Sequence, residues 1–174
     1  MKDLNIGLFG FGTVGTGIYK VLGSARNAHA SIRRICVHSL AKKRSVELPD
    51  GMLTDNAADI LDDPEIDLIV EVVDNAEASY AIVTEALRRG IPVVSGNKAM
   101  IARHLPELIK LQRANNTALL YDASACGSIP VIRNLEEYYD NDLLLEVKGI
   151  LNGSSNYILS RVFDHGENYA DALA

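Results

Sequence analysis

The sequence has 174 residues, enough for one domain and part of a second, and its 48% hydrophobic and 23% charged residues are ordinary for a globular protein. A net charge of −6 argues against a general nucleic-acid-binding protein, and no apolar run approaches the roughly 20 residues of a membrane span. Cys36 and Cys126 are too few for a disulfide framework, and we expect both to be small buried residues. Because an apolar strand pattern starts at once, we expect no signal peptide and a cytoplasmic protein.

The first thirty residues predict a strand, a glycine turn and a helix. An apolar run over residues 4–9 is typical of a buried strand, and the following segment, Gly10-Phe11-Gly12-Thr13-Val14-Gly15, has the GxGxxG spacing. After it, helical spacing over residues 13–22 predicts that Val14, Ile18, Val21 and Leu22 share one apolar face.

The glycine segment predicts a site for the pyrophosphate of a dinucleotide. Gly10 permits the tight turn, Gly12 lets the pyrophosphate approach the backbone, and Gly15 lets the helix pack closely on the strand. The free N–H groups and the dipole of the helix start favour the phosphate charge. We therefore expect all six residues, Gly10 to Gly15, to bind cofactor; the alternative is a purely structural glycine turn.

A second strand is predicted over residues 31–37, and its end should lie at the adenosine ribose of the cofactor. The segment after it contains no carboxylate, which an NAD site would use for the 2′-hydroxyl, and it has three consecutive cations, Lys42, Lys43 and Arg44. We therefore expect NADP(H) to be preferred over NAD(H), with His38, Ser39, Lys42 and Lys43 as cofactor contacts. The alternative is a solvated basic loop.

The middle of the sequence predicts a loop, a short helix and a third strand. Pro49-Asp50-Gly51 marks the turn of the loop, and Thr54 or Asn56 can cap a helix that runs to Leu61. Residues 66–73 form a nearly continuous apolar run, as in a parallel strand that is covered on both faces. Glu71 interrupts this run, and we assign it a structural role, with partners or with access to solvent at the strand end.

Polar residues follow the next two strands at the edge where an open parallel sheet binds ligands. Asn75 comes directly after residues 66–73 and is a candidate contact to the cofactor, ahead of a helix over 76–89 that ends at Gly90. A strand over 91–95 ends at Ser95, a further candidate cofactor contact. Lys98 follows it and is the candidate for chemistry, because a lysine in a cleft can bind a carboxylate or polarise a carbonyl. The alternative is a surface lysine that opens a helix over 99–103.

A helix over residues 105–115 and a strand over 117–121 complete an alternating β-α order. This alternation predicts an α/β fold, a Rossmann-type doubly wound parallel sheet with helices on both faces. The remainder predicts a helix from Pro130 to about 140, a strand over 143–151, a helix over 157–163 and a last helical stretch over 169–174 that stops without a C-terminal cap. The polar turn over 152–156 could bind an anion or could simply cap the next helix.

Four segments together resemble the N-terminal part of homoserine dehydrogenase, along essentially the whole chain. They are GFGTVG at 10–15, VVSGNKA at 93–99, DASACGSIP at 122–130 and KGILNGSSNYIL at 148–159. The first is shared by many Rossmann enzymes, whereas the last two in this order are specific to the family. The resemblance implies an NAD(P)-binding domain over 1–128 and the truncated start of an α+β substrate and dimerisation domain over 129–174.

The resemblance also implies an activity. Enzymes of this family transfer hydride between NAD(P) and the pair L-homoserine and L-aspartate 4-semialdehyde, in the biosynthesis of threonine, methionine and isoleucine, and a homodimer is expected for the full-length enzyme. Lys98 matches the catalytic lysine at the junction of nicotinamide and substrate. Gly153 and Ser154 match a loop on the substrate side, so Lys98, Gly153 and Ser154 are the implied substrate-binding residues.

A monovalent cation, usually sodium, is implied in the same way, at Asp122, Ala125, Gly127 and Ile129. Oxygen ligands suit such a cation. The family usually has the longer glutamate where this chain has Asp122, and the shorter side chain leaves room for a water between the carboxylate and the ion.

The family's later substrate-binding carboxylates and second lysine have no counterpart in the sequence. We therefore expect the chain to bind cofactor without the full catalytic set. Two alternatives remain, a related oxidoreductase similar to aspartate dehydrogenase and a stand-alone nucleotide-binding or regulatory module.

Overall fold

The structure, a computed structural model, describes residues 3–25, 29–127 and 129–174. It divides into two compact units, Met1–Tyr121 and Asp122–Ala174. The domain boundary expected from the sequence falls at Ser128, which lies outside the described residues. Each unit is described by itself below.

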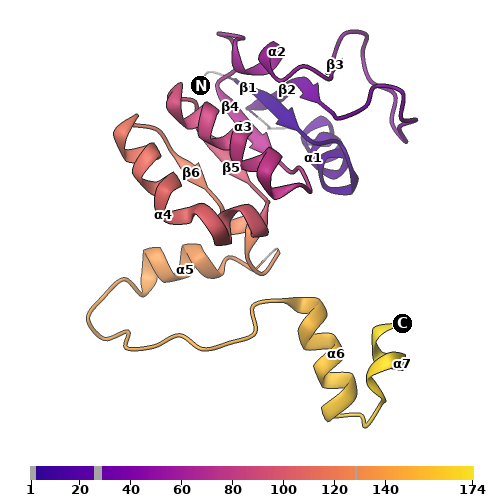
Figure 1. Cartoon of the computed structure of the whole chain (residues 1–174), viewed down its shortest axis with the longest axis vertical. Helices are drawn as coiled ribbons and strands as arrows, with labels where there is room; N and C mark the ends of the chain where they lie inside the picture. The colour runs from indigo at the N-terminus through magenta and orange to yellow at the C-terminus, as the bar shows by residue number, and fades with distance from the viewer. Residues whose placement is uncertain (1–2, 26–28, 128) are drawn as a thin grey trace. The chain divides into compact units, whose positions relative to one another are not determined.

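The first unit is built on a sheet of six parallel strands in the order β3-β2-β1-β4-β5-β6 (Figure 1). The order reverses between β1 and β4, which creates the crevice where open α/β sheets bind ligands. The strands are β1 Leu4–Phe9, β2 Ala30–Cys36, β3 Leu53–Thr54, β4 Leu68–Glu71, β5 Val93–Ser95 and β6 Leu119–Leu120.

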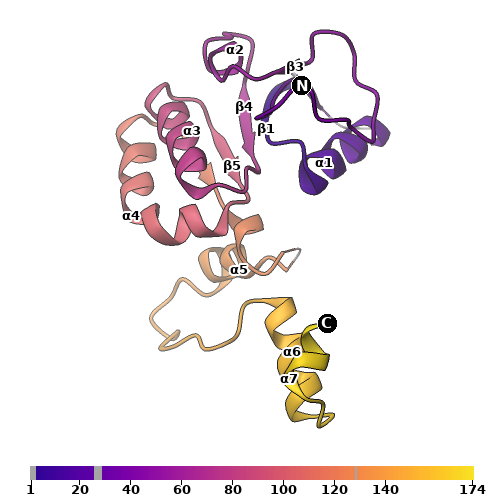
Figure 2. The ribbon, with the colours of Figure 1, turned by 45° about the vertical axis from the view of Figure 1, so that its right-hand side comes forward.

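Helices cover both faces of this sheet, as expected for a doubly wound fold. Figure 2 shows α3 and α4 on one side of the sheet and α1 on the other. The helices of this unit are α1 Thr13–Ser24, α2 Ala58–Leu61, α3 Ala76–Arg88 and α4 Lys98–Ala114. No helix of the described residues is both long enough and apolar enough to span a membrane.

Alternation along the strands supplies two separate cores. On β1, Leu8 belongs to one buried cluster with Ile35, against which Ile18 of α1 packs, while the next residue, Phe9, belongs to the other cluster with Val83 of α3 and Leu108 of α4. Successive side chains of a strand point to opposite faces, so both faces of the central strand are buried.

Three details of this unit differ from the expectations. Val14 and Val21 are 62% and 66% exposed, so the apolar face of α1 is narrower than predicted and the close contact to the sheet is made by Gly15. The two-residue strand β3 was not expected, because two residues carry no periodicity. The helices predicted over 99–103 and 105–115 are one helix, α4, which continues through Pro106 because Met100, Ile101 and Leu108 on either side of the proline pack into the same core.

In the second unit, the described residues form short helices joined by irregular segments. The helical elements are a 3₁₀ turn, η1 Asp122–Ser124, and the helices α5 Val131–Tyr138, α6 Gly153–Phe163 and α7 Tyr169–Leu173. The strand predicted over 143–151 is wrong: the segment has no regular structure, and Leu143 and Leu145 are 89% and 92% exposed. A strand needs a neighbouring strand for its backbone hydrogen bonds, and no strand of the described residues pairs with this segment.

Candidate functional site

A cleft of about 980 Å³ opens at the carboxyl ends of β1, β2 and β4. Its walls come from the glycine loop, the segment after β2, the segment after β3 and the start of α3. The lining residues are Phe9 to Val14, Cys36 to Ser39, Lys42, Arg44, Asp55, Ala57, Val72 to Asn75, Ala78 and Ile82. The cleft therefore lies at the switch point of the sheet, where the fold is expected to bind a ligand.

Two glycines of the loop are required by the fold itself. Gly10 has φ +95°, and a Cβ there would lie 2.7 Å from the Val72 carbonyl oxygen. A Cβ on Gly15 would lie 2.2 Å from the Gly10 carbonyl oxygen. These two positions thus allow the turn out of β1 and the close packing of α1.

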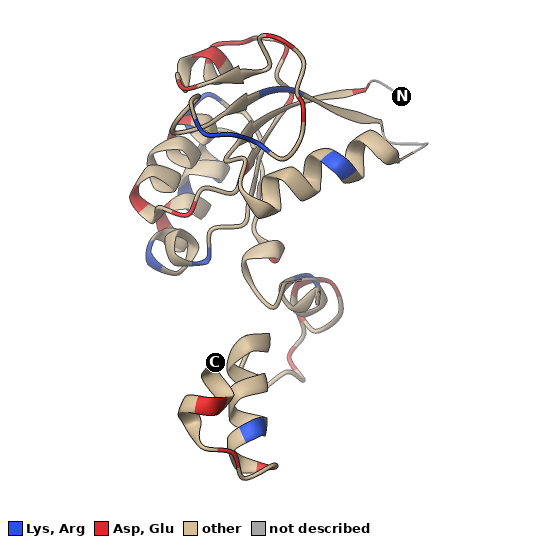
Figure 3. Ribbon diagram, turned by 90° about the vertical axis from the view of Figure 1, so that its right-hand side faces the viewer, with Lys and Arg blue, Asp and Glu red and all other residues tan. Residues whose placement is uncertain are grey.

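Gly12 is different, because a Cβ there would meet no protein atom within 4 Å. Its surroundings are open, it lines the cleft, and it is the residue directly before α1. The first turn of α1 has no acidic residue, and Lys20 is the only charged side chain of the helix (Figure 3). This helix start can accept the negative charge of a phosphate without repulsion from its own side chains.

The segment after β2 brings cationic and polar groups to the cleft. Of the residues that the sequence singles out, His38, Ser39 and Lys42 line the cleft and Lys43 does not. Arg44 also lines it; its Nη1 donates to the Phe11 carbonyl at 3.3 Å and its Nη2 to the Ser39 carbonyl at 2.7 Å. In the sequence Arg44 stands out only as one of three consecutive cations, whereas in the structure its side chain joins the glycine loop to the segment after β2.

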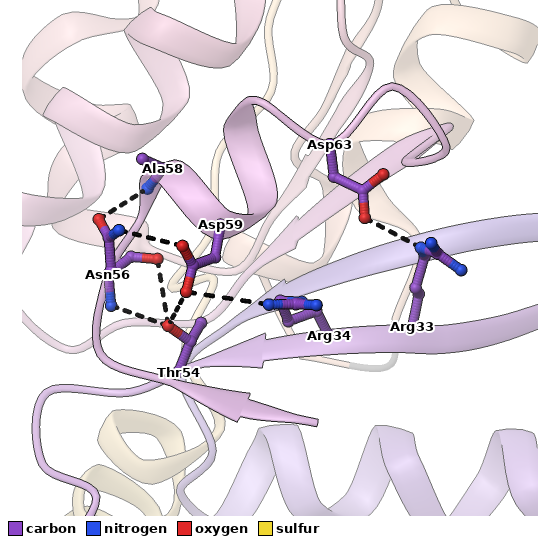
Figure 4. Close-up of polar contacts among 7 residues, drawn as sticks. All are labelled: Arg33, Arg34, Thr54, Asn56, Ala58, Asp59 and Asp63. Atoms are coloured by element: carbon purple, nitrogen blue, oxygen red, sulfur yellow. Dashed lines mark hydrogen bonds and ion pairs between the residues drawn. The ribbon is translucent and has the colours of Figure 1, made fainter. Parts of the chain in front are cut away.

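The segment after β3 adds a carboxylate, Asp55, to the cleft. Its neighbours are held in place: the Thr54 hydroxyl donates to Asp59 at 2.5 Å and accepts from the Asn56 amide at 3.0 Å (Figure 4). The Asn56 side-chain oxygen accepts from the Ala58 amide at 3.2 Å, whereas the residue directly before α2 is Ala57, which provides no side-chain cap. Asp55 was missed because nothing in the sequence indicates a strand as short as β3.

Cys36 lines the cleft, as does Asp55. Cys36 and Cys126 are both half-buried, whereas full burial was expected from the sequence. Burial raises the pKa of the Cys36 thiol, and the Asp55 and Asp59 carboxylates raise that pKa further. The thiol form is therefore favoured in the cleft.

Among the candidates after β4 and β5, only Asn75 lines the cleft. Its side chain accepts from the Ala78 amide at 2.9 Å and so begins α3. Ser95 is fully buried, and its hydroxyl donates to Glu71. Lys98 is exposed and is the first residue of α4, directly after Asn97, which caps that helix.

The remaining candidates lie in the second unit. Asp122 begins η1, and its carboxylate accepts from the Arg133 amide at 3.4 Å. Ala125, Gly127 and Ile129 follow in a turn in which Gly127 has φ +60°. Gly153 and Ser154 form the first turn of α6, which Asn152 caps through the Ser155 amide at 2.8 Å. No group of three His, Cys, Asp or Glu side chains that could hold a metal occurs among the described residues.

The chain matches the models of a known protein family. Residues 10–122 match the model of the NAD-binding domain of homoserine dehydrogenase, and residues 130–174 match the model of homoserine dehydrogenase. The chain belongs to the homoserine dehydrogenase family. The resemblance seen in the sequence is confirmed, and the first unit is the family's NAD(P)-binding domain.

Individual homoserine dehydrogenases match along nearly the whole chain. The Bacillus subtilis enzyme is 33% identical over 99% of the chain, and the Helicobacter pylori enzyme is 35% identical over 99%. The crystal structure of homoserine dehydrogenase from Thiobacillus denitrificans superposes with a TM-score of 0.83 at 35% identity over 99% of the chain. A hyperthermophilic archaeal homoserine dehydrogenase in complex with NADPH has the same fold, with a TM-score of 0.76 at 23% identity over 99% of the chain.

The chain spans less than half of most of these relatives. It covers 42% of the Bacillus subtilis protein, 41% of the Helicobacter pylori protein and 42% of the Thiobacillus denitrificans chain, and 60% of the archaeal chain.

Proposed function

We propose that this chain is the cofactor-binding part of an NADP(H)-preferring homoserine dehydrogenase, which interconverts L-homoserine and L-aspartate 4-semialdehyde. The observation that carries the proposal is the cleft, where a glycine loop and a cationic segment face one another at the switch point of the sheet. Such an enzyme works in the cytoplasm as a homodimer, in the biosynthesis of threonine, methionine and isoleucine.

The chain's own groups fit the two charged parts of NADP(H). The open backbone at Gly12 and the start of α1 receive the pyrophosphate. Ser39, Lys42 and Arg44 line the cleft after β2 and suit the 2′-phosphate, because guanidinium and ammonium groups pair with phosphate oxygens. Lys43 adds positive charge beside them, and His38 and Asn75 complete the contacts. When bound, the nicotinamide supplies the hydride acceptor or donor.

Lys98 acts on the substrate in this proposal. It lies exposed at the start of α4, one residue after the helix cap, so its ammonium group is free to reach a carboxylate or a carbonyl oxygen. The N–H groups of Gly153 and Ser154 at the start of α6 bind a further anionic or carbonyl group of the substrate. Ser95 supports this region from the last position of β5, where its hydroxyl donates to Glu71.

A monovalent cation, sodium, bound by Asp122, Ala125, Gly127 and Ile129 is the second expected ligand. Carboxylate and carbonyl oxygens are suitable donors for it. One Asp122 oxygen already accepts from the Arg133 amide, which leaves the other for the ion or for a bridging water. Replacing sodium by choline in the buffer should lower the thermal stability of the second unit, and an unchanged melting curve would remove the ion from this proposal.

The test of the function is homoserine-dependent reduction of NADP⁺ by this chain, compared with Lys98→Ala. Turnover that falls by about 100-fold or more in the variant, the range that electrostatic groups supply at the reacting centre, supports the role of Lys98. Binding of NADPH without turnover means that the chain holds the cofactor and lacks part of the catalytic set. Measurable turnover that is equal in both proteins contradicts the role given to Lys98.

A further inference from the structure

A buried carboxylate lies directly behind the cleft, at the end of β4. Glu71 is fully buried, yet three donors surround it: the Val73 amide at 2.7 Å, and the hydroxyls of Ser79 and Ser95 at 2.5 and 2.7 Å. The sequence left open whether this side chain reaches solvent, and the structure shows that it does not. All three neighbours donate, so a group that only accepts is required at this place.

These contacts continue into a closed ring of hydrogen bonds. The Asn97 amide donates to the Ser95 hydroxyl at 3.2 Å, and the Asn97 side-chain amide donates to the Val73 carbonyl at 2.8 Å. Since the Val73 amide donates to Glu71 and Ser95 donates to Glu71, the ring passes through Glu71, Val73, Asn97 and Ser95 and returns to its start. A backbone hydrogen bond, from the Gly96 amide to the Glu71 carbonyl at 2.9 Å, runs beside the ring.

Each side of the ring ends at a functional segment. On one side, residues 72–75 line the cofactor cleft. On the other side, the Asn97 side chain accepts from the Met100 amide at 2.8 Å and so begins α4, whose first residue is Lys98. The ring thus joins the backbone of the cleft to the backbone that carries the proposed catalytic lysine.

We propose that Glu71 is a positioning residue that holds the cleft segment 72–75 and the start of α4 in one fixed arrangement, so that the nicotinamide side of the cofactor cleft and Lys98 are set together. The effect of Glu71 on NADPH affinity rests on the proposed NADP(H) function. Its effect on amide hydrogen exchange around the ring in the free protein does not.

Glu71→Gln is the direct test. The glutamine amide has the size of the carboxylate and places an N–H₂ group against neighbours that already donate. One buried hydrogen bond is therefore lost. We expect NADPH affinity to fall by about tenfold, the effect of losing one buried hydrogen bond. In the free chain, amide hydrogen exchange of Val73 and Asn97 should become at least tenfold faster, while that of Leu8 in β1 keeps its rate.

A second variant guards against a simple loss of folding. Asn97→Asp keeps the oxygen that caps α4 and replaces only the side-chain N–H₂ that donates to the Val73 carbonyl. Because both changes break the same ring, the double variant should bind NADPH no more weakly than the weaker-binding single variant. Independent effects would instead multiply.

Val83→Ala is the matched control, because Val83 is fully buried in α3 and its apolar side chain makes none of the hydrogen bonds of the ring. It should lower the melting temperature and leave NADPH affinity and the exchange of Val73 unchanged at a temperature where the variant is folded. Two results would overturn the inference: Val83→Ala matching the affinity loss of Glu71→Gln, or unchanged exchange at Val73 and Asn97 in the ring variants. If the parent chain fails to bind NADPH, the function proposed above fails, and the exchange rates still decide the role of the ring.

Discussion

Gly12 and Gly15 lie three residues apart in one motif, yet glycine is required at the two positions for different physical reasons. Gly15 touches the Gly10 carbonyl so closely that no side chain fits, whereas the space beside Gly12 is open. Gly15 therefore serves the fold, and Gly12 serves what enters the cleft. The GxGxxG spacing alone predicts that both positions need glycine. The surroundings of each glycine in the fold distinguish the two roles.

This separation gives a paired prediction. Gly15→Ala should lower the free energy of unfolding by about 1–3 kcal/mol, the range for forcing an added methyl into a packed site. Gly12→Ala should lower the free energy of unfolding by about 1 kcal/mol or less, as for an unfavourable residue before a helix. It should weaken NADPH binding more than tenfold, because the added methyl group occupies the space through which the pyrophosphate approaches the backbone. Urea unfolding and NADPH titration of both variants check this, and a Gly12→Ala protein that binds NADPH as well as the parent would show that no phosphate lies there.

Cys36 provides a prediction of pH dependence. Its pKa is raised, first by burial and then by Asp55 and Asp59, so the thiolate forms only at higher pH than in a free cysteine, whose pKa is about 8.5. In a Cys126→Ser background, the rate of alkylation by iodoacetamide should therefore rise with an inflection above the free-cysteine value. Asp55→Asn should move that inflection to lower pH. An inflection at or below the free-cysteine value would contradict the assigned environment.

At the scale of elements, the sequence predicts those that are long and periodic. The strand before the glycine loop, the helix that ends near Gly90 and the doubly wound parallel sheet follow from apolar spacing, glycine placement and the β-α alternation, and the structure confirms them. The two-residue β3 carries no periodic signal, so Asp55 was not selected. Nor does apolar spacing along the chain reveal the ring around Glu71, because its members come from two strands, from the segment after β4 and from the cap of α4.

The segment 143–151 shows the limit of reading strands from composition. Its residues, rich in Leu, Val and Ile, favour a strand, but the described residues offer it no partner strand, and Leu143 and Leu145 stay exposed. Backbone amides over 143–151 of this chain should therefore exchange close to the unprotected rate, while those of β1 and β4 are protected. Hydrogen exchange followed by mass spectrometry checks this, and strong protection over 143–151 would mean that the segment pairs with another strand.

At the scale of the molecule, the cofactor cleft is confined to the first unit. Its lining residues come from the glycine loop, from the segments after β2, β3 and β4, and from α3. Cofactor binding is therefore the property of this chain that the described geometry supports most directly.

The central claim is that the cleft at the carboxyl ends of β1, β2 and β4 binds NADP(H) in preference to NAD(H). Calorimetric titration of the 174-residue chain with NADPH and with NADH, at one salt concentration, tests it most directly. The account predicts saturable one-to-one binding of NADPH, at least tenfold tighter than NADH, because one strong charge-assisted contact to the 2′-phosphate is worth about 1.5–3 kcal/mol. Equal or tighter binding of NADH would contradict the role of Lys42 and Arg44, and the absence of binding by either cofactor would contradict the assignment of the cleft.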